Sequence, residues 1–485
     1  MEMHEQEEAR TGAAAPRPAR RVLAASVAGV AGAAVLGGAL VLLPGARTAP
    51  PPAPGPVAQA RDAVASGVPA ALPDLALLIT DREARLRTRP RDARSWAVLG
   101  AAYVEQGRRT AEAAYYPKAE RALRTSLELR ARRNAPALDG LAALALARRD
   151  FPAARRWGEA ARKRAPKRWT TRALLVEAYT GLGDHRAARR TLAELMKLHS
   201  GPAVLARAAA VYRDRGWRED AAARLADAAA SAGAPAERAA YLERAGQLAW
   251  ERGDREAALR HFQEAVRTDP DLRAAQAGQG RALAALGRTT EALAAYRMAL
   301  ARQPCPEYAL ELGELYESLG LAQAARVQYD LLRERVRQAA AGGVDGELVL
   351  GRFEADHADP RAAVRRLRTE WRRQPGTAVA DALGWALHRA GRDEEALRFA
   401  RIATDRVHGG EVRSALYSYH RGVIERALER YGPARRQLQE ALRINPYFSP
   451  VHAPAARAAL AALGEPQVRD VPDFTAPRCR SGRCG

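Results

Sequence analysis

The side chains best suited to acid–base, nucleophilic or metal chemistry are few in this sequence and lie far apart. The chain has nine histidines and three cysteines among 485 residues. Zinc sites and common catalytic centres place such residues at short, characteristic spacings, and no HExxH, zinc-type Cys/His cluster, GxSxG or phosphate-binding glycine loop occurs. The segment from His408 to Glu411 favours a loop between structural units over half of a metal site. We therefore predict no catalytic residue, no metal and no cofactor.

Two of the three cysteines, Cys479 and Cys484, lie close together in the C-terminal sequence APRCRSGRCG. In an exported chain the compartment permits disulfides, so this pair could close a small loop. The alternatives are two unpaired thiols, or a metal site for which no third ligand is evident. Cys305 follows a proline and is expected to be a lone thiol at a turn.

The composition favours an all-helical protein. Hydrophobic residues, mostly alanine, make up 47% of the chain, but only 6% of residues are aromatic. Lysine and arginine number 78 against 56 acidic residues, giving a net charge of +22, and all but four of the basic residues are arginine. Alanine, leucine, arginine and glutamate are strong helix formers, and β-branched residues are scarce. This mixture excludes collagen-like, disulfide-scaffold and wholly disordered chains, and the length suits about three domains or one repeat array.

The N-terminal region predicts a membrane anchor. Residues 22–43 carry no charge and are long enough to cross a bilayer. Three arginines precede them closely and one follows, so the positive-inside rule places residues 1–21 in the cytoplasm and the chain after residue 43 outside. The alternative is a signal peptide and a secreted product, although the nearest cleavage-type sequence, residues 44–46, begins with proline. Residues 44–71 are predicted to form an extended Pro/Ala-rich linker.

Residues 96–446 repeat at a period near 34. Six residues of the clearest copy recur 34 positions later: Gly246, Gly253, Ala258, Phe262, Ala265 and Pro270 correspond to Gly280, Gly287, Ala292, Tyr296, Ala299 and Pro304. This pattern resembles the tetratricopeptide repeat (TPR), in which small residues allow two antiparallel helices to pack closely, glycine marks the turn and proline follows the second helix. The resemblance implies an all-α fold, a right-handed TPR α-solenoid of about ten helix-turn-helix units, placed after the single transmembrane helix.

The segments on either side of the repeats are expected to cover their exposed ends. Residues 72–95 predict a capping helix, and residues 447–485 a C-terminal cap and flexible tail. Residues 114–123, 305–320 and 445–460 are also similar to a family of exported bacterial TPR proteins. That resemblance implies a single-pass protein of the bacterial cell membrane with its array outside the cytoplasm, but it implies no particular activity.

The resemblance also implies that ligands lie on the inner face, which the first helix of each unit lines. TPR proteins that bind a C-terminal carboxylate carry Asn at the ninth repeat position and Lys or Arg at the fifth, and neither occurs at those positions in any of the ten units. The remaining inner-face candidates are polar or aromatic: Gln247, Trp250, Glu251, Glu314, Glu317, Trp385, His388 and Arg389. Exposed tryptophan and arginine are typical binding anchors. Either tryptophan could instead pack against a neighbouring helix.

The positive charge is concentrated. Residues 121–200 hold 19 basic and 7 acidic residues, more than half of the net charge, mostly on the predicted outer helices and without interleaved aromatics. No nucleic-acid partner is expected. We predict a membrane-anchored scaffold that binds a protein or peptide partner in the cell envelope without catalysis. The first alternative is binding of anionic lipid or a cell-wall polymer through residues 121–200, and the second is an enzyme with an unrecognised site.

Overall fold

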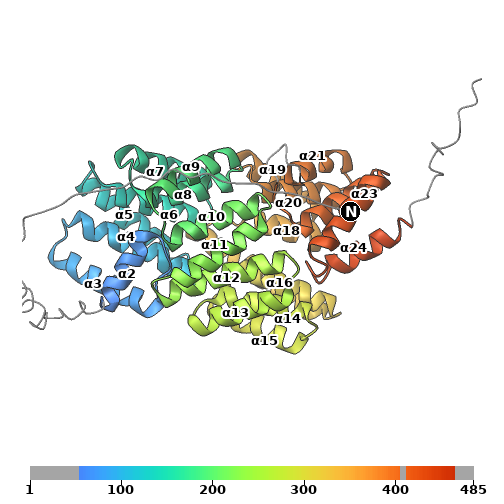
Figure 1. Cartoon of the computed structure of the whole chain (residues 1–485), viewed down its shortest axis with the longest axis horizontal. Coiled ribbons are helices and arrows are strands. Elements are labelled where there is room, and N and C mark those ends of the chain that lie inside the picture. Colours follow the sequence, from blue (N-terminus) through green and yellow to red (C-terminus); the bar gives the residue numbers. More distant parts are fainter. Residues whose placement is uncertain (1–53, 405–410, 465–485) are drawn as a thin grey trace, which may run out of the picture. The chain divides into compact units, whose positions relative to one another are not determined.

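The computed structural model describes residues 54–404 and 411–464, and over these ranges every regular element is an α-helix (Figure 1). Ten consecutive helix pairs follow two leading helices, α2 (Pro56–Ser66) and α3 (Leu72–Thr88), and one helix, α24 (His452–Ala461), follows the pairs. The first five pairs, units one to five, are α4 (Ala93–Thr110) with α5 (Tyr115–Leu129), α6 (Ala135–Ala147) with α7 (Phe151–Arg164), α8 (Trp169–Gly181) with α9 (His185–Leu198), α10 (Pro202–Asp214) with α11 (Arg218–Ser231), and α12 (Pro235–Glu251) with α13 (Arg255–Thr268). Units six to ten are α14 (Arg273–Ala285) with α15 (Thr289–Arg302), α16 (Pro306–Ser318) with α17 (Ala322–Ala341), α18 (Glu347–His357) with α19 (Pro360–Arg373), α20 (Thr377–Arg389) with α21 (Asp393–Thr404), and α22 (Ala415–Ala427) with α23 (Tyr431–Ile444). The predicted all-α solenoid of about ten units is confirmed.

The small residues of the repeat pack as the sequence predicts. Phe262 of α13 is fully buried, and its ring lies between Gly246 of its own unit and Gly278 of the next. A Cβ atom at Gly246 or Gly278 would come within 2.7 or 2.5 Å of that ring, so no larger residue fits at either position without movement. Gly253 has a φ of +81°, the left-handed conformation that glycine adopts without strain, at the turn between the two helices.

The N-terminal segment differs from its prediction. Part of the linker expected over residues 44–71 is helix α2, whose Ala60 is buried against α3 and α4. Pro56 is compatible with this helix because it lies in the first turn, where its missing N–H has no intrahelical partner to lose, and Gly67 ends the helix with a φ of +68°. The predicted cytoplasmic tail (1–21), the membrane helix (22–43), Cys479 and Cys484 lie outside the described residues. Of the helices that are described, none combines the length and apolar character of a bilayer span.

The array also makes contacts between units that lie far apart in the sequence, and the repeat pattern does not indicate these contacts. The turns of units two to five touch the connection that follows the unit five places later, and the end of α4 in unit one accepts a hydrogen bond from Gln303, which follows unit six. Arg148 donates from Nε to the Gly342 carbonyl oxygen at 2.8 Å, and Asn445 donates from Nδ2 to the Trp250 carbonyl oxygen at 2.8 Å. At Gly183, a Cβ atom would lie 2.5 Å from the carbonyl oxygen of Pro375. We call these the return contacts.

A buried inter-unit ion pair joins Arg109, near the end of α4, to Asp269, just after α13. Arg109 Nη2 lies 2.7 Å from Asp269 Oδ2, and the two side chains are 4% and 9% exposed. The remaining nitrogens of Arg109, Nε and Nη1, are buried without a hydrogen-bond partner. The Asp269 carboxylate is therefore the main group that offsets the free-energy cost of burying the Arg109 guanidinium.

Candidate binding cavity of the first three units

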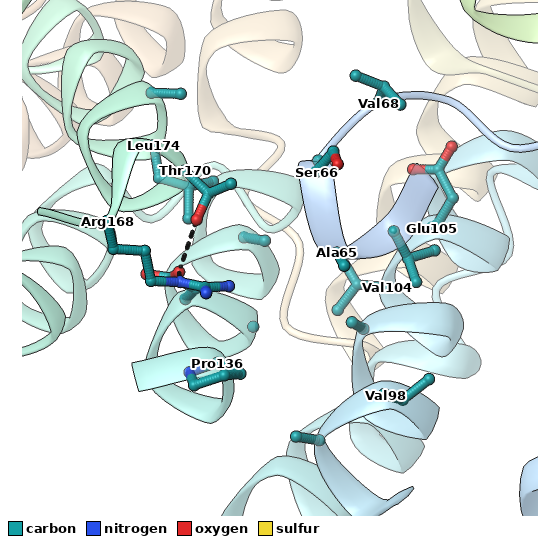
Figure 2. A pocket seen from close by; sticks show the side chains of 18 of the residues that line it. Ala65, Ser66, Val68, Val98, Val104, Glu105, Pro136, Arg168, Thr170 and Leu174 are labelled. Atoms are coloured by element: carbon teal, nitrogen blue, oxygen red, sulfur yellow. Dashed lines mark hydrogen bonds and ion pairs between the residues drawn. The ribbon is translucent and has the colours of Figure 1, made fainter. Parts of the chain in front are cut away.

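The first helices of units one to three enclose a cavity of about 650 Å³, which α2 borders on another side (Figure 2). Residues that the repeat register places at the fifth and ninth positions line it: Ala97, Ala101, Asp139, Ala143, Ala173 and Glu177. The prediction that the first helix of each unit lines the inner face is confirmed for these three units. α2, which sequence analysis did not anticipate, contributes Ala65 and Ser66.

The walls of the cavity are largely apolar. Figure 2 shows Ala65 and Val68 across the space from Leu174, with Val98 and Val104 on α4 below them. Small alanines at the inner-face positions leave the space open, since a larger side chain at the ninth position of unit one or two would enter it. A cavity of this size with mostly apolar walls and a few polar groups is typical of a ligand site.

The charged groups around this space are predominantly arginines. Eight arginines and four carboxylates line it. Three of the arginines are held by acidic partners within the cavity: Arg168 Nε lies 2.5 Å from Asp139 Oδ2, Arg207 Nη1 lies 2.6 Å from Glu177 Oε2, and Arg108 Nη2 lies 2.8 Å from Glu105 Oε2. Arg61 pairs with its neighbour Asp62 at 3.0 Å.

The other four arginines have no acidic partner within the described chain: Arg94, Arg130, Arg133 and Arg244. Arg244 comes from α12 of unit five and projects toward the same space as Arg207. Burial, and then repulsion from Arg207, lower the pKa of Arg244 below its ordinary value. Glu243 and Glu177 attract Arg244 but form no ion pair with it, so its guanidinium is available to an anionic ligand group.

The pKa of Glu177 shows the same positive field. Burial alone would raise this pKa, but the guanidinium groups of Arg207, Arg244 and Arg108 hold it below the usual value for glutamate. Glu177 therefore stays ionised and does not neutralise the arginines by itself. The net charge of the lining residues is +4, the difference between its eight arginines and four carboxylates.

Arg207 and Arg244 are not among the residues predicted from the sequence. Both occupy the sixth position of their units, directly after the fifth position, where carboxylate-binding TPR proteins carry a basic residue. The sixth-position residues Val98, Gly140 and Leu174 also line the cavity, so this position faces inward repeatedly. The signal for these two arginines in the sequence is therefore a basic residue at the sixth repeat position of units four and five.

The predicted groove candidates form three groups outside this cavity. In the first, Glu251 accepts hydrogen bonds from Gln247 Nε2 at 3.0 Å and from Arg213 Nε at 2.6 Å. Trp250 is only 7% exposed and packs in the hydrophobic core, with the Arg281 guanidinium 6.0 Å from its ring centre. These residues are thus engaged with neighbouring helices.

The second group surrounds His357. Its Nδ1 lies 3.1 Å from Glu317 Oε2 and its Nε2 lies 3.9 Å from Glu314 Oε1. The imidazole stacks on Tyr329, whose hydroxyl donates to Glu317 at 2.7 Å. Glu317 is therefore hydrogen-bonded within the array, whereas Glu314 lies near His357 without a hydrogen bond to it.

The third group surrounds Asp356. Its Oδ1 accepts from Trp385 Nε1 at 2.9 Å and from Arg389 Nη1 at 3.0 Å, and His452 Nε2 lies 3.3 Å from Oδ2. Trp385 is 5% exposed, and His388 pairs instead with Asp393. Both tryptophans therefore pack against neighbouring helices, the alternative considered above. A ligand-binding role for the eight candidates stays a prediction.

The Asp356–His452 pair predicts a pH-dependent stability. Burial would lower the pKa of His452, but the hydrogen bond and charge of Asp356 raise it above the ordinary value of 6.5. Burial would raise the pKa of Asp356, but His452 and Trp385 lower it to about 2, so this carboxylate stays ionised. The stabilising contribution of the protonated histidine is therefore complete below about pH 6 and is lost as the pH rises through the raised pKa.

We expect His452→Gln to lower the free energy of unfolding by about 1–2 kcal/mol near pH 5.5, and by less near pH 8.5. Urea unfolding at both pH values measures the difference, and Asp356→Asn should reproduce it. Parallel pH profiles for the wild type and both variants would contradict the assignment.

Comparison with known proteins identifies the repeats. Residues 243–304 and 278–340 match the family model of the tetratricopeptide repeat. No curated protein sequence matches the chain.

Several solved structures align with this chain at low sequence identity. The human IFIT1 dimer with PPP-AAAA is 16% identical, with 65% of this chain and 73% of that chain covered and a TM-score of 0.44. A monomeric IFIT1 mutant with Gppp-AAAA is also 16% identical, with 69% and 77% covered and a TM-score of 0.45. A tetratricopeptide repeat protein from Parabacteroides merdae is 18% identical, with 54% and 98% covered and a TM-score of 0.31. From the family match and the helix pairs, residues 243–340 are tetratricopeptide repeats within an all-α, TPR-like solenoid.

Proposed function

We propose that this protein is a membrane-tethered scaffold that binds a segment of a partner polypeptide in the cavity of its first three units. The proposal assigns no catalytic step to the array. The proposed peptide binding rests on the cavity itself, an open space of about 650 Å³ with apolar walls and more arginines than carboxylates. The apolar residues 22–43 support the tether, and the basic residues before them support an array outside the cytoplasm.

The chemistry of the cavity selects among peptides. Leucine-sized side chains fit against Val98, Val104 and Leu174, where burial of apolar surface is favourable. Carboxylates suit Arg244 and the arginines near the entrance, because charge-assisted hydrogen bonds to guanidinium are strong. We therefore propose that the bound segment combines apolar and acidic side chains.

Fluorescence anisotropy tests this selectivity with three pools of labelled octapeptides, in which leucine is combined in shuffled order with glutamate, glutamine or lysine. The leucine/glutamate pool is expected to bind most tightly. Ala143→Trp should weaken binding of that pool about tenfold or more, because the indole would occupy space that the peptide needs. Arg244→Gln should weaken the leucine/glutamate pool about tenfold but leave the leucine/glutamine pool unchanged.

Matched controls are available on α15. Ala301 and Arg302 are exposed there, so Ala301→Trp and Arg302→Gln make the same chemical changes away from the cavity. Neither should alter binding by more than about twofold. Equal affinity for the three pools, or equal effects of the cavity and control variants, would refute the proposed site.

A further inference from the structure

The return contacts leave one edge of the solenoid uncovered. The connections that follow units six to ten are covered by the turns of units one to five, as at Pro375, which faces Gly183. Among the described residues, no helix pair precedes unit one, so no turn of an earlier pair covers the connections that follow units one to three. We call these connections, residues 129–134, 163–168 and 196–200, the free connection edge.

Neighbouring parts of this edge lie close together. Lys163 and Pro166 border the same surface depression as Lys197 and Leu198. Arg130 and Arg133 border the cavity together with Arg168 at the end of the next connection. The three segments are therefore consecutive neighbours along one side of units one to three.

The free connection edge combines apolar and cationic side chains. Leu129, Met196 and Leu198 are 40%, 41% and 37% exposed, and all three lie on this edge. Seven exposed cations accompany them, with no acidic partner in the described chain: Arg130, Arg132, Arg133, Lys163, Arg164, Lys167 and Lys197. Three of the four lysines of the whole sequence belong to this set.

We propose that the free connection edge lies on an anionic phospholipid surface. Exposed leucine and methionine side chains can enter the headgroup layer while the surrounding lysines and arginines meet lipid phosphates. The predicted tether is short enough to keep the array near the bilayer. Twelve residues, 44–55, separate the predicted anchor from α2 and span at most about 40 Å. This argument from the linker rests on the membrane tether of the proposed function, whereas the composition of the edge does not.

A second copy of the chain fits this edge less well. The surface it would offer is the uncovered turn edge of units six to ten, where Cβ atoms at Gly287, Gly320 and Gly391 would meet no other atom within 4 Å. Between residues 287–291, 358–361, 391–395 and 429–431 this turn edge mixes four arginines with six carboxylates. A phosphatidylglycerol bilayer presents anionic groups alone, so it is the better complement to seven unpaired cations.

An environment-sensitive fluorophore tests the proposal in the full chain. Cys305, Cys479 and Cys484 are replaced by serine, Leu198→Cys is labelled with NBD, and the protein is reconstituted in phosphatidylcholine nanodiscs with or without phosphatidylglycerol. We expect the emission to shift to the blue, and quenching by a lipid-borne spin label, only when phosphatidylglycerol is present. About 0.5 M salt should reverse both changes. A label at Leu321→Cys, on the turn edge, should respond to neither lipid.

Charge reversal provides the matched comparison. Lys163→Glu, Lys167→Glu and Lys197→Glu together should abolish the response at residue 198, since each basic residue near an anionic surface changes affinity roughly fivefold. The control variant, Arg260→Glu, Arg267→Glu and Arg302→Glu, makes the same change at exposed positions on α13 and α15 and should retain the response. Unchanged helical circular dichroism verifies folding of both variants.

Separate measurements on the same samples report on the membrane anchor, the peptide cavity and the free connection edge, so each assignment can fail on its own. Insertion into discs of phosphatidylcholine alone reports on residues 22–43, and peptide binding to the same samples reports on the cavity. A label at residue 198 that responds equally to both lipids, or to neither, overturns the lipid assignment. Concentration-dependent energy transfer between copies, independent of lipid charge, would also overturn it and assign the edge to a second copy.

Discussion

Asp269→Ala is expected to destabilise the array by about 3–5 kcal/mol, the cost of leaving a buried charge without its partner. Arg109 Nη2 lies 2.7 Å from Asp269, and the arginine side chain is only 4% exposed. Its other two guanidinium nitrogens have no hydrogen-bond partner, so no neighbouring group can replace the lost carboxylate. Urea unfolding followed by circular dichroism measures the loss.

The matched control is Glu291→Ala, which removes an exposed carboxylate from its pair with Arg288. These side chains are 57% and 45% exposed, and we expect no measurable change in the free energy of unfolding, because water screens this pair. Replacing both buried partners, with Arg109→Met and Asp269→Ala, should recover part of the lost stability, because no charge is then left buried. Equal effects of Asp269→Ala and Glu291→Ala would show that the Arg109–Asp269 contact does not hold the units together.

Phe262→Ala is expected to destabilise the array by about 3–5 kcal/mol for a different reason. The ring is fully buried between two units, and the glycines beside it cannot move inward to fill the space that its removal would create. Because stability in a solenoid depends on contacts between adjacent units, the loss should lower the protection of amide hydrogens in α12, α13 and α14 most strongly. Hydrogen exchange measured by mass spectrometry resolves these helices.

Met298→Ala serves as the control for this prediction, since Met298 lies on α15 and is 57% exposed. It should change stability by at most about 0.5 kcal/mol. Phe262→Leu should fall between the two variants because it retains part of the buried volume. A Phe262→Ala protein as stable as Met298→Ala would contradict the packing described for units five and six.

The ten helix pairs could be predicted from the sequence because their determinants are local. Gly246, Phe262 and Gly278 recur within about one repeat length, and the packing of one unit on the next follows from those residues alone. The inner face of units one to three was predictable for the same reason. Once the register is known, Ala101 and Ala143 must face the same way.

The return contacts could not be predicted because they depend on an accumulated geometry. Arg148 meets Gly342 only after a small rotation between successive units has been repeated five times, and no short sequence pattern encodes that sum. The burial of Trp250 and Trp385 escaped prediction for a related reason. The register places each on a first helix, but whether its indole points inward or against a neighbour depends on side-chain packing.

The location of the excess charge also needed the structure. Residues 121–200 were expected to carry their basic residues mainly on the outer helices, and Arg155 and Arg156 of α7 are indeed exposed there. The cavity and the free connection edge, however, draw on residues between the helices, such as Arg133 and Lys167. Connections contribute to a surface only once the positions of adjacent units are known.

Hydrogen exchange of the full chain with and without the leucine/glutamate peptide pool tests whether the cavity of units one to three binds peptide. We expect added protection in α4, α6 and α8, together with the part of α12 that carries Arg244, and no change in α20 to α24. Ala143→Trp should remove this protection. Protection confined to the helices that carry Trp385 and His388, or no protection anywhere at saturating peptide, would contradict the assignment of the cavity as the binding site.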